Sequence, residues 1–158
     1  MVSDALSRVV VVLDHPKDVV NIAGVVRVMM NFGLSRLRLV QPDEFDSYRI
    51  GGIAHRSAPL TESATLHETL EDAVADANFI VGTTARARTA GRSYVRPREI
   101  GGVIAEKAAD STVAIVLGRE DRGLTNEDRI IQQTIPVEIL DGSPVLRLIE
   151  WLVRVSAL

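Results

Sequence analysis

Cysteine is absent from the 158-residue chain, and so is any apolar run of the length that a membrane helix needs. Without cysteine there is neither a disulfide framework nor a thiolate metal site, which fits a reducing compartment. A membrane-spanning helix takes roughly 18 consecutive apolar residues, and the N-terminus lacks the basic-then-apolar order of a signal peptide. We therefore expect a cytoplasmic protein with no membrane-embedded part.

Several familiar catalytic motifs are also missing. The sequence contains no Gly-x-Ser-x-Gly, no Walker-type phosphate loop, no His-Glu-x-x-His and no full Gly-x-Gly-x-x-Gly. These absences disfavour the usual hydrolytic arrangements and a classical nucleotide-binding Rossmann enzyme. The three histidines, His15, His55 and His67, are scattered along the chain, so we expect no metal site.

The net charge is −3, which disfavours a protein that coats nucleic acid nonspecifically, because that mode of binding relies on a broad excess of Lys and Arg. One segment nevertheless concentrates positive charge. It holds five arginines and no acidic residue between the first and the last: Arg86, Arg88, Arg92, Arg96 and Arg98. This segment is the first indication of a binding partner.

The residues that are present alternate between strand-like and helix-like stretches. With 46% hydrophobic and 25% charged residues, the chain has the balance of one globular domain, which we expect to span residues 1–158. Short β-branched or apolar runs predict strands at residues 8–13, 37–40, 79–81 and 113–117, and the stretches between them predict helices at residues 19–31, 66–77 and 97–109. This alternation predicts an α/β fold with a parallel sheet flanked by helices on both faces.

Two details refine this prediction. Gly33 follows the first predicted helix and can adopt the left-handed conformation that closes a helix C-terminus. Residues 41–63 are the least regular part of the chain and predict a loop with a short helix around residues 53–57.

Ligands of open α/β sheets bind beyond the carboxyl ends of the strands, so the loops at residues 14–21, 82–94 and 118–126 are candidate site loops. Residues 82–88 (GTTARAR) combine a permissive glycine with two hydroxyls and two guanidinium groups, although a simple turn with a solvated basic tail is also possible. In residues 118–127 (GREDRGLTNE), Arg119 and Glu120 form either a salt bridge or a pair of site residues. Spacing alone leaves both alternatives open.

Asn21 and Arg27 lie six positions apart on the first predicted helix, among residues that are mostly apolar. An unpaired guanidinium in such surroundings must find a partner or reach water, because burying an isolated charge is very costly. Arg27 could therefore bind phosphate, or it could extend from the helix to the surface.

Taken in chain order, several segments form a pattern that none of them forms alone. They are Asn21-x-x-Gly24-x-x-Arg27, Met30 to Leu34 with Leu37, Leu39 and Val40, Gly82 to Arg88, Pro97-Arg98-Glu99, and Gly118 to Glu127. In this order and spacing they resemble the SpoU/TrmH family of SPOUT-class RNA 2′-O-ribose methyltransferases. The Gly-Thr-Thr-Ala-Arg and Pro-Arg-Glu segments resemble its TrmJ-like tRNA branch, and the resemblance covers about residues 8–136.

The resemblance implies a parallel sheet with a C-terminal trefoil knot, S-adenosylmethionine as methyl donor, and a homodimer whose active site takes residues from both subunits. By position in the motifs, Arg27 corresponds to the family's catalytic arginine and Asn21 to its accompanying asparagine. Thr83, Thr84, Ala85 and Gly118 fall where backbone contacts to the cofactor are expected, and Glu120 belongs to the same motif. The five arginines of residues 86–98 then become phosphate contacts that position RNA, with tRNA and its anticodon loop as the expected substrate.

The sequence departs from the family pattern after about residue 138. Family members place a Ser-Leu-Asn-Leu type segment before the last helix, whereas residues 141–148 (DGSPVLRL) contain no Asn. Either Ser143 or Val145 could occupy the serine position at the cofactor. Three explanations stay open: a divergent but active enzyme, a catalytically impaired paralogue that binds RNA or cofactor, and a sequence altered at its end.

Overall fold

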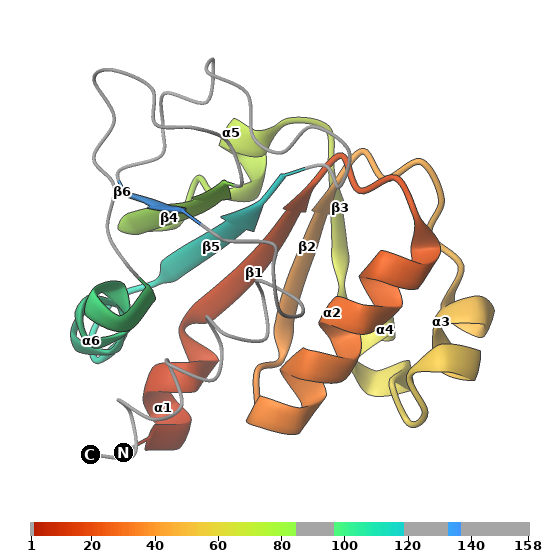
Figure 1. Ribbon diagram of the computed structural model, residues 1–158, viewed down its shortest axis with the longest axis horizontal. Helices are drawn as coiled ribbons and strands as arrows, with labels where there is room; N and C mark the ends of the chain where they lie inside the picture. Colours follow the sequence, from red (N-terminus) through yellow and green to blue (C-terminus); the bar gives the residue numbers. More distant parts are fainter. Residues whose placement is uncertain (1, 85–96, 119–132, 137–158) are drawn as a thin grey trace.

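The computed structural model describes residues 2–84, 97–118 and 133–136, and these residues form one six-stranded sheet in which all neighbouring strands run parallel (Figure 1). The strand order is β3-β2-β1-β5-β4-β6. The strands are β1 (Val9–Asp14), β2 (Arg36–Val40), β3 (Thr65–His67), β4 (Phe79–Thr84), β5 (Val113–Leu117) and β6 (Gln133–Pro136). The α/β fold with a parallel sheet, predicted from the alternation, is confirmed.

The helices are α1 (Val2–Ser7), α2 (Val19–Phe32), α3 (Ser47–Ile53), α4 (Ala58–Ser63), α5 (Leu70–Ala73) and α6 (Pro97–Ala108). The boundaries of α2 have clear local causes. The Asp18 side chain accepts a hydrogen bond from the backbone N–H of Val20 at the N-terminus. Gly33 ends the helix at φ 79°, and its N–H donates to the carbonyls of Met29 and Met30. The predicted C-terminal glycine of this helix is confirmed.

Two predicted helices are wrong. Residues 66–77 contain the end of the edge strand β3 and the short helix α5 rather than one continuous helix. Leu70, Ala73 and Val74 are buried at helical spacing, and this spacing made the whole run resemble a helix. The helix expected at residues 53–57 is instead the connection between α3 and α4, where Arg56 has a left-handed φ of 64° that interrupts helical structure.

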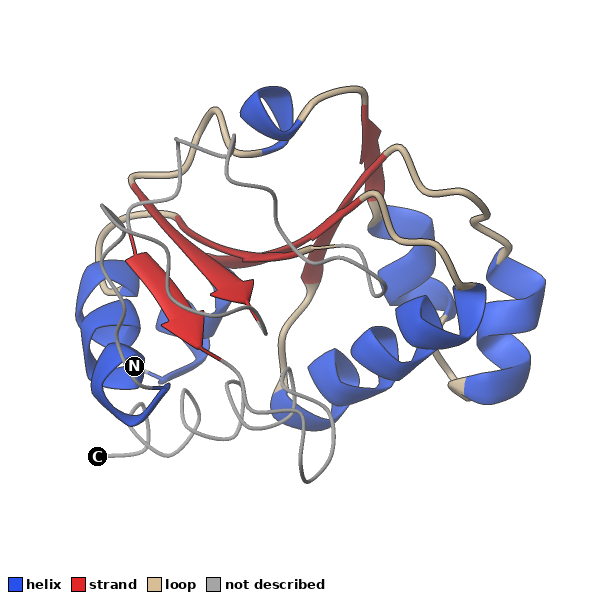
Figure 2. Ribbon diagram, turned by 45° about the horizontal axis from the view of Figure 1, so that its top comes forward, coloured by secondary structure: helices blue, strands red, loops and turns tan. Residues whose placement is uncertain are grey.

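Alternate residues of the strands supply two separate hydrophobic clusters, one on each face of the sheet. Val9, Val11 and Leu13 of β1 belong to the larger cluster with buried residues of α1, α2, α3, α4 and α6. Val10 and Val12 belong to the smaller cluster, which α5 covers together with Val74. Figure 2 shows the same arrangement among the described residues, with the short helix α5 on one side of the curved sheet and the other helices on the opposite side. Helices on both faces, as predicted, leave the strand ends as the accessible edge.

Several sequence-based expectations concern residues that the structure does not describe. The C-terminal trefoil knot and the 141–148 segment lie outside the described residues. Within the described residues, the helices are too short or too polar to cross a bilayer.

Candidate active site at the carboxyl edge of the sheet

The register of the sheet brings the ends of four strands into one row. Leu13 of β1 pairs with Leu117 of β5, which pairs with Thr83 of β4, and Thr83 pairs in turn with Ile135 of β6. Because neighbouring strands lie about 4.8 Å apart, the residues that follow this row lie close together. They are Asp14, Gly118, Thr84 and Pro136, and we call the ends of these four strands the strand-end row.

Three of the predicted cofactor residues are therefore neighbours. Thr83 and Thr84 end β4, and Gly118 directly follows β5. Their position at the carboxyl edge fits a nucleoside-type ligand, because ligands of open α/β sheets bind where the strands end, and Gly118 lies beyond the last paired residue of β5. Ala85, Glu120, Ser143 and Val145 lie outside the described residues.

Asn21 and Arg27 both lie on the exposed side of α2. The buried side of this helix consists of Val19, Ile22, Ala23, Val25, Val26 and Met29. Arg27 is therefore not a buried charge, and its guanidinium forms no hydrogen bond or ion pair with the residues that the structure describes. A guanidinium that is charged, exposed and unpaired is available to an anionic ligand.

The backbone of Arg27 lies along α2, away from the start of this helix at the carboxyl edge of the sheet. Helix α2 starts at the carboxyl edge and runs back along the sheet toward β2, as Figure 1 shows. At 1.5 Å per residue, Arg27 lies about 12 Å along the helix axis from Val19. The backbone of Arg27 therefore lies about two helical turns from the end of α2 that is nearest to the carboxyl edge.

The last residue of β1, Asp14, and the residue after it, His15, form a polar pair that the sequence analysis did not identify. Nδ1 of His15 lies 2.7 Å from Oδ1 of Asp14, and the Asp14 side chain is only 14% exposed. His15 has a left-handed φ of 52°, and its N–H donates to the carbonyl of Val40 at 2.8 Å. In the sequence, the only signal for this pair is the Asp14-His15-Pro16 triplet that follows the apolar run of residues 9–13.

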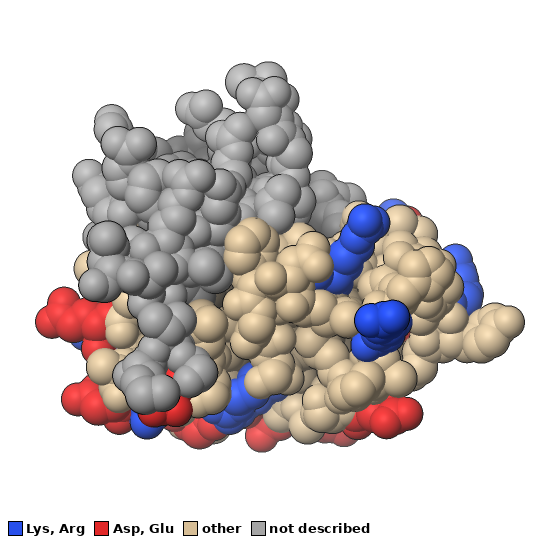
Figure 3. Space-filling view, turned by 90° about the horizontal axis from the view of Figure 1, so that it is seen from below, with Lys and Arg blue, Asp and Glu red and all other residues tan. Residues whose placement is uncertain are grey.

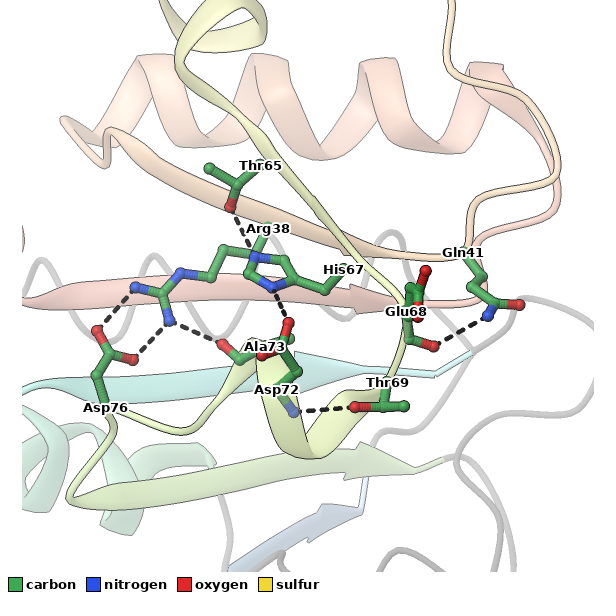
Figure 4. A network of polar contacts seen from close by, with 9 residues as sticks. All are labelled: Arg38, Gln41, Thr65, His67, Glu68, Thr69, Asp72, Ala73 and Asp76. Carbon is green, nitrogen blue, oxygen red and sulfur yellow. Dashed lines mark hydrogen bonds and ion pairs between the residues drawn. The ribbon is translucent and has the colours of Figure 1, made fainter.

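A second polar network fastens β2 and β3 to α5 (Figure 4). The Arg38 guanidinium donates to Oδ1 and Oδ2 of Asp76 at 2.6 and 2.9 Å, and it also donates to the carbonyl of Ala73. The hydrogen bond from Arg38 is the main cause that lowers the pKa of Asp76 to about 2 and raises the pKa of Arg38 above its usual value. This network lies on the face of the sheet that α5 covers and joins secondary-structure elements to one another, so we assign it a structural role.

The five arginines of residues 86–98 are not placed as RNA contacts by the structure. Arg86, Arg88, Arg92 and Arg96 lie outside the described residues. Arg98 lies in the first turn of α6, but its side chain is not among those described. On the face shown in Figure 3, the described Lys and Arg side chains stand apart from one another among neutral and acidic residues.

No group of three or more His, Asp or Glu residues suited to a metal ion occurs among the described residues.

The fold and its strand-end row define a parallel α/β protein of the kind that binds ligands beyond the carboxyl ends of its strands. Residues 8–140 match the SpoU rRNA Methylase family, and the chain belongs to this family. The family resemblance noted in the sequence is therefore confirmed.

A similar curated protein is the tRNA (cytidine/uridine/adenosine-2′-O-)-methyltransferase TrmJ of Pseudomonas aeruginosa. It is 38% identical over 124 residues, which cover 78% of this chain and 48% of the relative. The chain spans about half the length of the curated relatives it matches.

Solved structures share the fold. A probable methylase family protein from Haemophilus influenzae superposes with a TM-score of 0.84 at 27% identity, over 96% of this chain and 67% of that one. A probable methyltransferase from Bordetella pertussis superposes with a TM-score of 0.82 at 27% identity, over 99% of both chains. The SPOUT-class sheet architecture is confirmed by these likenesses.

Proposed function

We propose that this chain is an S-adenosylmethionine-dependent RNA methyltransferase that methylates a ribose 2′-hydroxyl of tRNA, in the anticodon loop. The observation that carries the proposal is the family match over residues 8–140, together with the 38% identity to a tRNA 2′-O-methyltransferase. The strand-end row supports it, because Thr83, Thr84 and Gly118 meet where a ligand of an α/β sheet binds.

S-adenosylmethionine, when bound, supplies an electrophilic methyl group on a sulfonium. In the proposal it is held by backbone groups of Thr83, Thr84, Ala85 and Gly118, with Glu120 organising the loop and Ser143 or Val145 closing the site. The described members of this set, Thr83, Thr84 and Gly118, lie at the ends of two paired strands, which suits a ligand that is held mainly through the backbone.

Arg27 and Asn21 act on the RNA in this proposal. Arginine keeps its proton up to a pH of about 12, so Arg27 is unsuited to removing a proton. It orients the ribose or its phosphate and stabilises negative charge that develops on the 2′-oxygen. Asn21 accompanies it from the first turn of the same helix, where it is exposed. Arg27 is exposed and has no hydrogen-bond or ion-pair partner among the residues that the structure describes, which supports this role.

We further propose that the active unit is a homodimer. Arg27 lies along α2, about 12 Å from the helix start at the carboxyl edge, and its side chain points into solvent. A second subunit that covers this face of α2 would bring Arg27 to the cofactor edge of its partner. Sedimentation of the pure protein tests the dimer, and mixed dimers of two inactive variants test the sharing: Arg27→Ala and Thr84→Asp subunits should regain activity together.

The proposal also covers the domain organisation, the location of the protein in the cell and the residues that contact RNA. Residues 1–158 would form one methyltransferase domain that works in the cytoplasm, without a metal and without a membrane. The likeness to the Bordetella pertussis chain over 99% of both chains supports one domain of this length. Arg86, Arg88, Arg92, Arg96 and Arg98 would contact RNA phosphates.

The test is methyl transfer from labelled S-adenosylmethionine to total tRNA, followed by mapping of the 2′-O-methylated nucleotide. We expect wild type to be active and Arg27→Ala to lose at least about 100-fold in kcat, the scale of removing one charge-stabilising group. Arg49→Ala is the matched control, because Arg49 is also an exposed helical arginine but is paired with Glu44 at 2.7 Å. Equal rates for wild type and Arg27→Ala would refute the catalytic assignment. Binding of tRNA without S-adenosylhomocysteine binding would instead favour an impaired paralogue.

A further inference from the structure

Asp14 and His15 form a carboxylate–imidazole pair in which one ring nitrogen is occupied and the other is free. The Asp14 oxygen lies 2.7 Å from Nδ1. A largely buried carboxylate at Nδ1 holds the N–H on that nitrogen and leaves Nε2 as a proton acceptor. The His15 side chain is 40% exposed, and Nε2 has no polar partner among the described residues. The pair therefore has the arrangement of an oriented base that a substrate can reach.

The backbone of His15 is held in an unfavourable conformation. Its φ of 52° lies in the left-handed region, which residues other than glycine adopt infrequently. Pro16 follows directly, and a residue before proline favours extended backbone instead. Such strained conformations cluster at functional sites. The N–H of His15 bonds to Val40, so the neighbouring strand fixes this turn.

The position of the pair relates it to the proposed methyl-donor site. Leu13 pairs with Leu117, so Asp14 and Gly118 follow them at the same edge on adjacent strands. Thr84 follows Thr83 one strand further along the row. With strands about 4.8 Å apart, the pair lies beside the proposed cofactor loops rather than on a remote surface.

The other two histidines show what distinguishes His15. Both ring nitrogens of His67 are occupied, Nε2 by Thr65 Oγ1 at 2.8 Å and Nδ1 by Asp72 at 2.9 Å (Figure 4). His55 is exposed and has no polar partner in the described chain, so nothing orients its ring. Of the three, His15 alone combines an orienting carboxylate with a free nitrogen in the part of the chain that the structure describes.

We infer that His15, oriented by Asp14, is the proton acceptor for the ribose 2′-hydroxyl, an inference that rests on the proposed function. Nε2 takes the hydroxyl proton while the 2′-oxygen exchanges its bond to hydrogen for a bond to the methyl carbon. The electron pair of the broken carbon–sulfur bond stays on sulfur, so the donor leaves as a neutral thioether. The imidazolium, stabilised by Asp14, then returns its proton to water.

The surrounding charges bear on the pH dependence of this step. Asp14 contacts the ring, Lys17 and Asp18 lie on the same loop, and Asp43 lies on the loop after β2, where its N–H donates to the Pro16 carbonyl at 3.0 Å. An imidazole changes its protonation near neutral pH, and only the neutral ring accepts a proton. The rate of methyl transfer in wild type should therefore fall as the pH is lowered, and this dependence should be lost when His15 is replaced.

The test uses His15→Asn and Asp14→Asn, with His55→Asn as the matched control. Asn tolerates left-handed backbone, so the turn is retained. We expect His15→Asn to lower kcat at least about 100-fold, the scale of general base catalysis, and to abolish the acid limb of the pH profile. Calorimetric affinity for S-adenosylhomocysteine and affinity for tRNA should equal those of wild type, and His55→Asn should keep full activity.

A readout independent of activity is the nitrogen NMR spectrum of the histidine rings in the free protein. We expect the neutral ring of His15 to carry its proton on Nδ1 in wild type and to lose this preference in Asp14→Asn. Retention of kcat and of the acid limb in His15→Asn, or a proton on Nε2 in wild type, would overturn the inference while leaving the proposed function intact. A wild-type protein that transfers no methyl to RNA would overturn both.

Discussion

Arg38 and Asp76 join β2 to the segment after α5 through two parallel hydrogen bonds, Nη1 to Oδ1 at 2.6 Å and Nη2 to Oδ2 at 2.9 Å. Arg36 lies 3.5 Å from the same carboxylate. The Arg38 side chain is only 14% exposed and also donates to the Ala73 carbonyl, so the pair anchors the outer part of the sheet to the helix that covers its second face. Bidentate geometry of this kind is more stabilising than a typical surface ion pair.

The Asp76 carboxylate predicts a loss of stability in acid. Its pKa in the folded protein is about 2, below the ordinary value of 3.8. A lowered pKa means that the contribution is fully present above the unfolded pKa and is lost as the pH falls from about 4 to about 2. Because half of the Asp76 side chain is exposed, solvent screening reduces the contribution to about 1 kcal/mol.

Asp76→Asn should therefore lower the free energy of unfolding at pH 7 by about 1 kcal/mol, and the difference from wild type should vanish near pH 2. Urea denaturation at several pH values measures both effects. Asp110→Asn is the control, since Asp110 is exposed and forms no ion pair in the described chain. An Asp76→Asn deficit that stays constant down to pH 2 would contradict the assignment to the ionised carboxylate.

Any side chain at position 33 should strain the backbone. Its φ of 79° is left-handed, while the nearest atom to an added Cβ, Leu6 Cδ1, lies at an ordinary 3.8 Å. The cost of Gly33→Ala is thus conformational rather than steric, about 1–2 kcal/mol of unfolding free energy. Gly51→Ala is the matched control, because Gly51 lies in α3 with nothing within 4 Å of an added Cβ. Denaturation midpoints that shift equally in both variants would show that backbone conformation is not the cause.

The parts of the fold that could be predicted are those whose secondary structure is determined by the residues of one short segment. Residues 9–13 of β1 and all of β5 are continuous apolar runs buried on both faces, while Asp18 caps the start of α2 and Gly33 ends it. The strand β3 escaped prediction because it is three residues long and Leu66, its apolar residue, is 62% exposed at the sheet edge. Its pairing with β2 depends on tertiary contact, which no local pattern encodes.

The candidate site divides in the same way. Asn21, Arg27, Thr83 and Gly118 are candidates through the family resemblance of their motifs, and the register of the sheet places Thr83 and Gly118 on adjacent strands. The Asp14–His15 pair was not recognisable, since a left-handed turn before Pro16 and a hydrogen bond between adjacent side chains have no sequence pattern of their own. Only the three-dimensional structure distinguishes His15, with one ring nitrogen bonded to Asp14, from His67, whose two ring nitrogens are both hydrogen-bonded.

Replacing Gly24 by alanine should change stability and activity in opposite directions. It lies on the exposed side of α2 between Asn21 and Arg27, with nothing within 4 Å of an added Cβ. Gly24→Ala should raise the free energy of unfolding by about 0.5–1 kcal/mol, because alanine loses less entropy in a helix. Under the proposed function the same methyl group obstructs the close approach of RNA or of a second subunit, so kcat/KM should fall. Gly52→Ala, an exposed glycine of α3, should keep full activity, and an unimpaired Gly24→Ala enzyme would argue against close contact at this face.

The arginine-rich segment predicts a salt dependence that can be measured one residue at a time. If Arg86 and Arg88 contact RNA phosphates, the affinity for tRNA falls with salt because neutralised phosphates release their counterions. Each lost contact should reduce the slope of log K against log salt by about 0.7–0.9. Filter binding of Arg86→Gln and Arg88→Gln between low and moderate salt measures this slope, and S-adenosylhomocysteine affinity should stay at the wild-type level.

Arg49→Gln supplies the control for the salt series, because its guanidinium is exposed but already paired with Glu44. Its slope should equal that of wild type. Since the net charge of the chain is −3, a general attraction to RNA is not expected, and the slope should come from a few contacts of this segment. Slopes that fall equally in Arg86→Gln and Arg49→Gln would indicate diffuse electrostatics and would remove the 86–98 segment from the RNA interface.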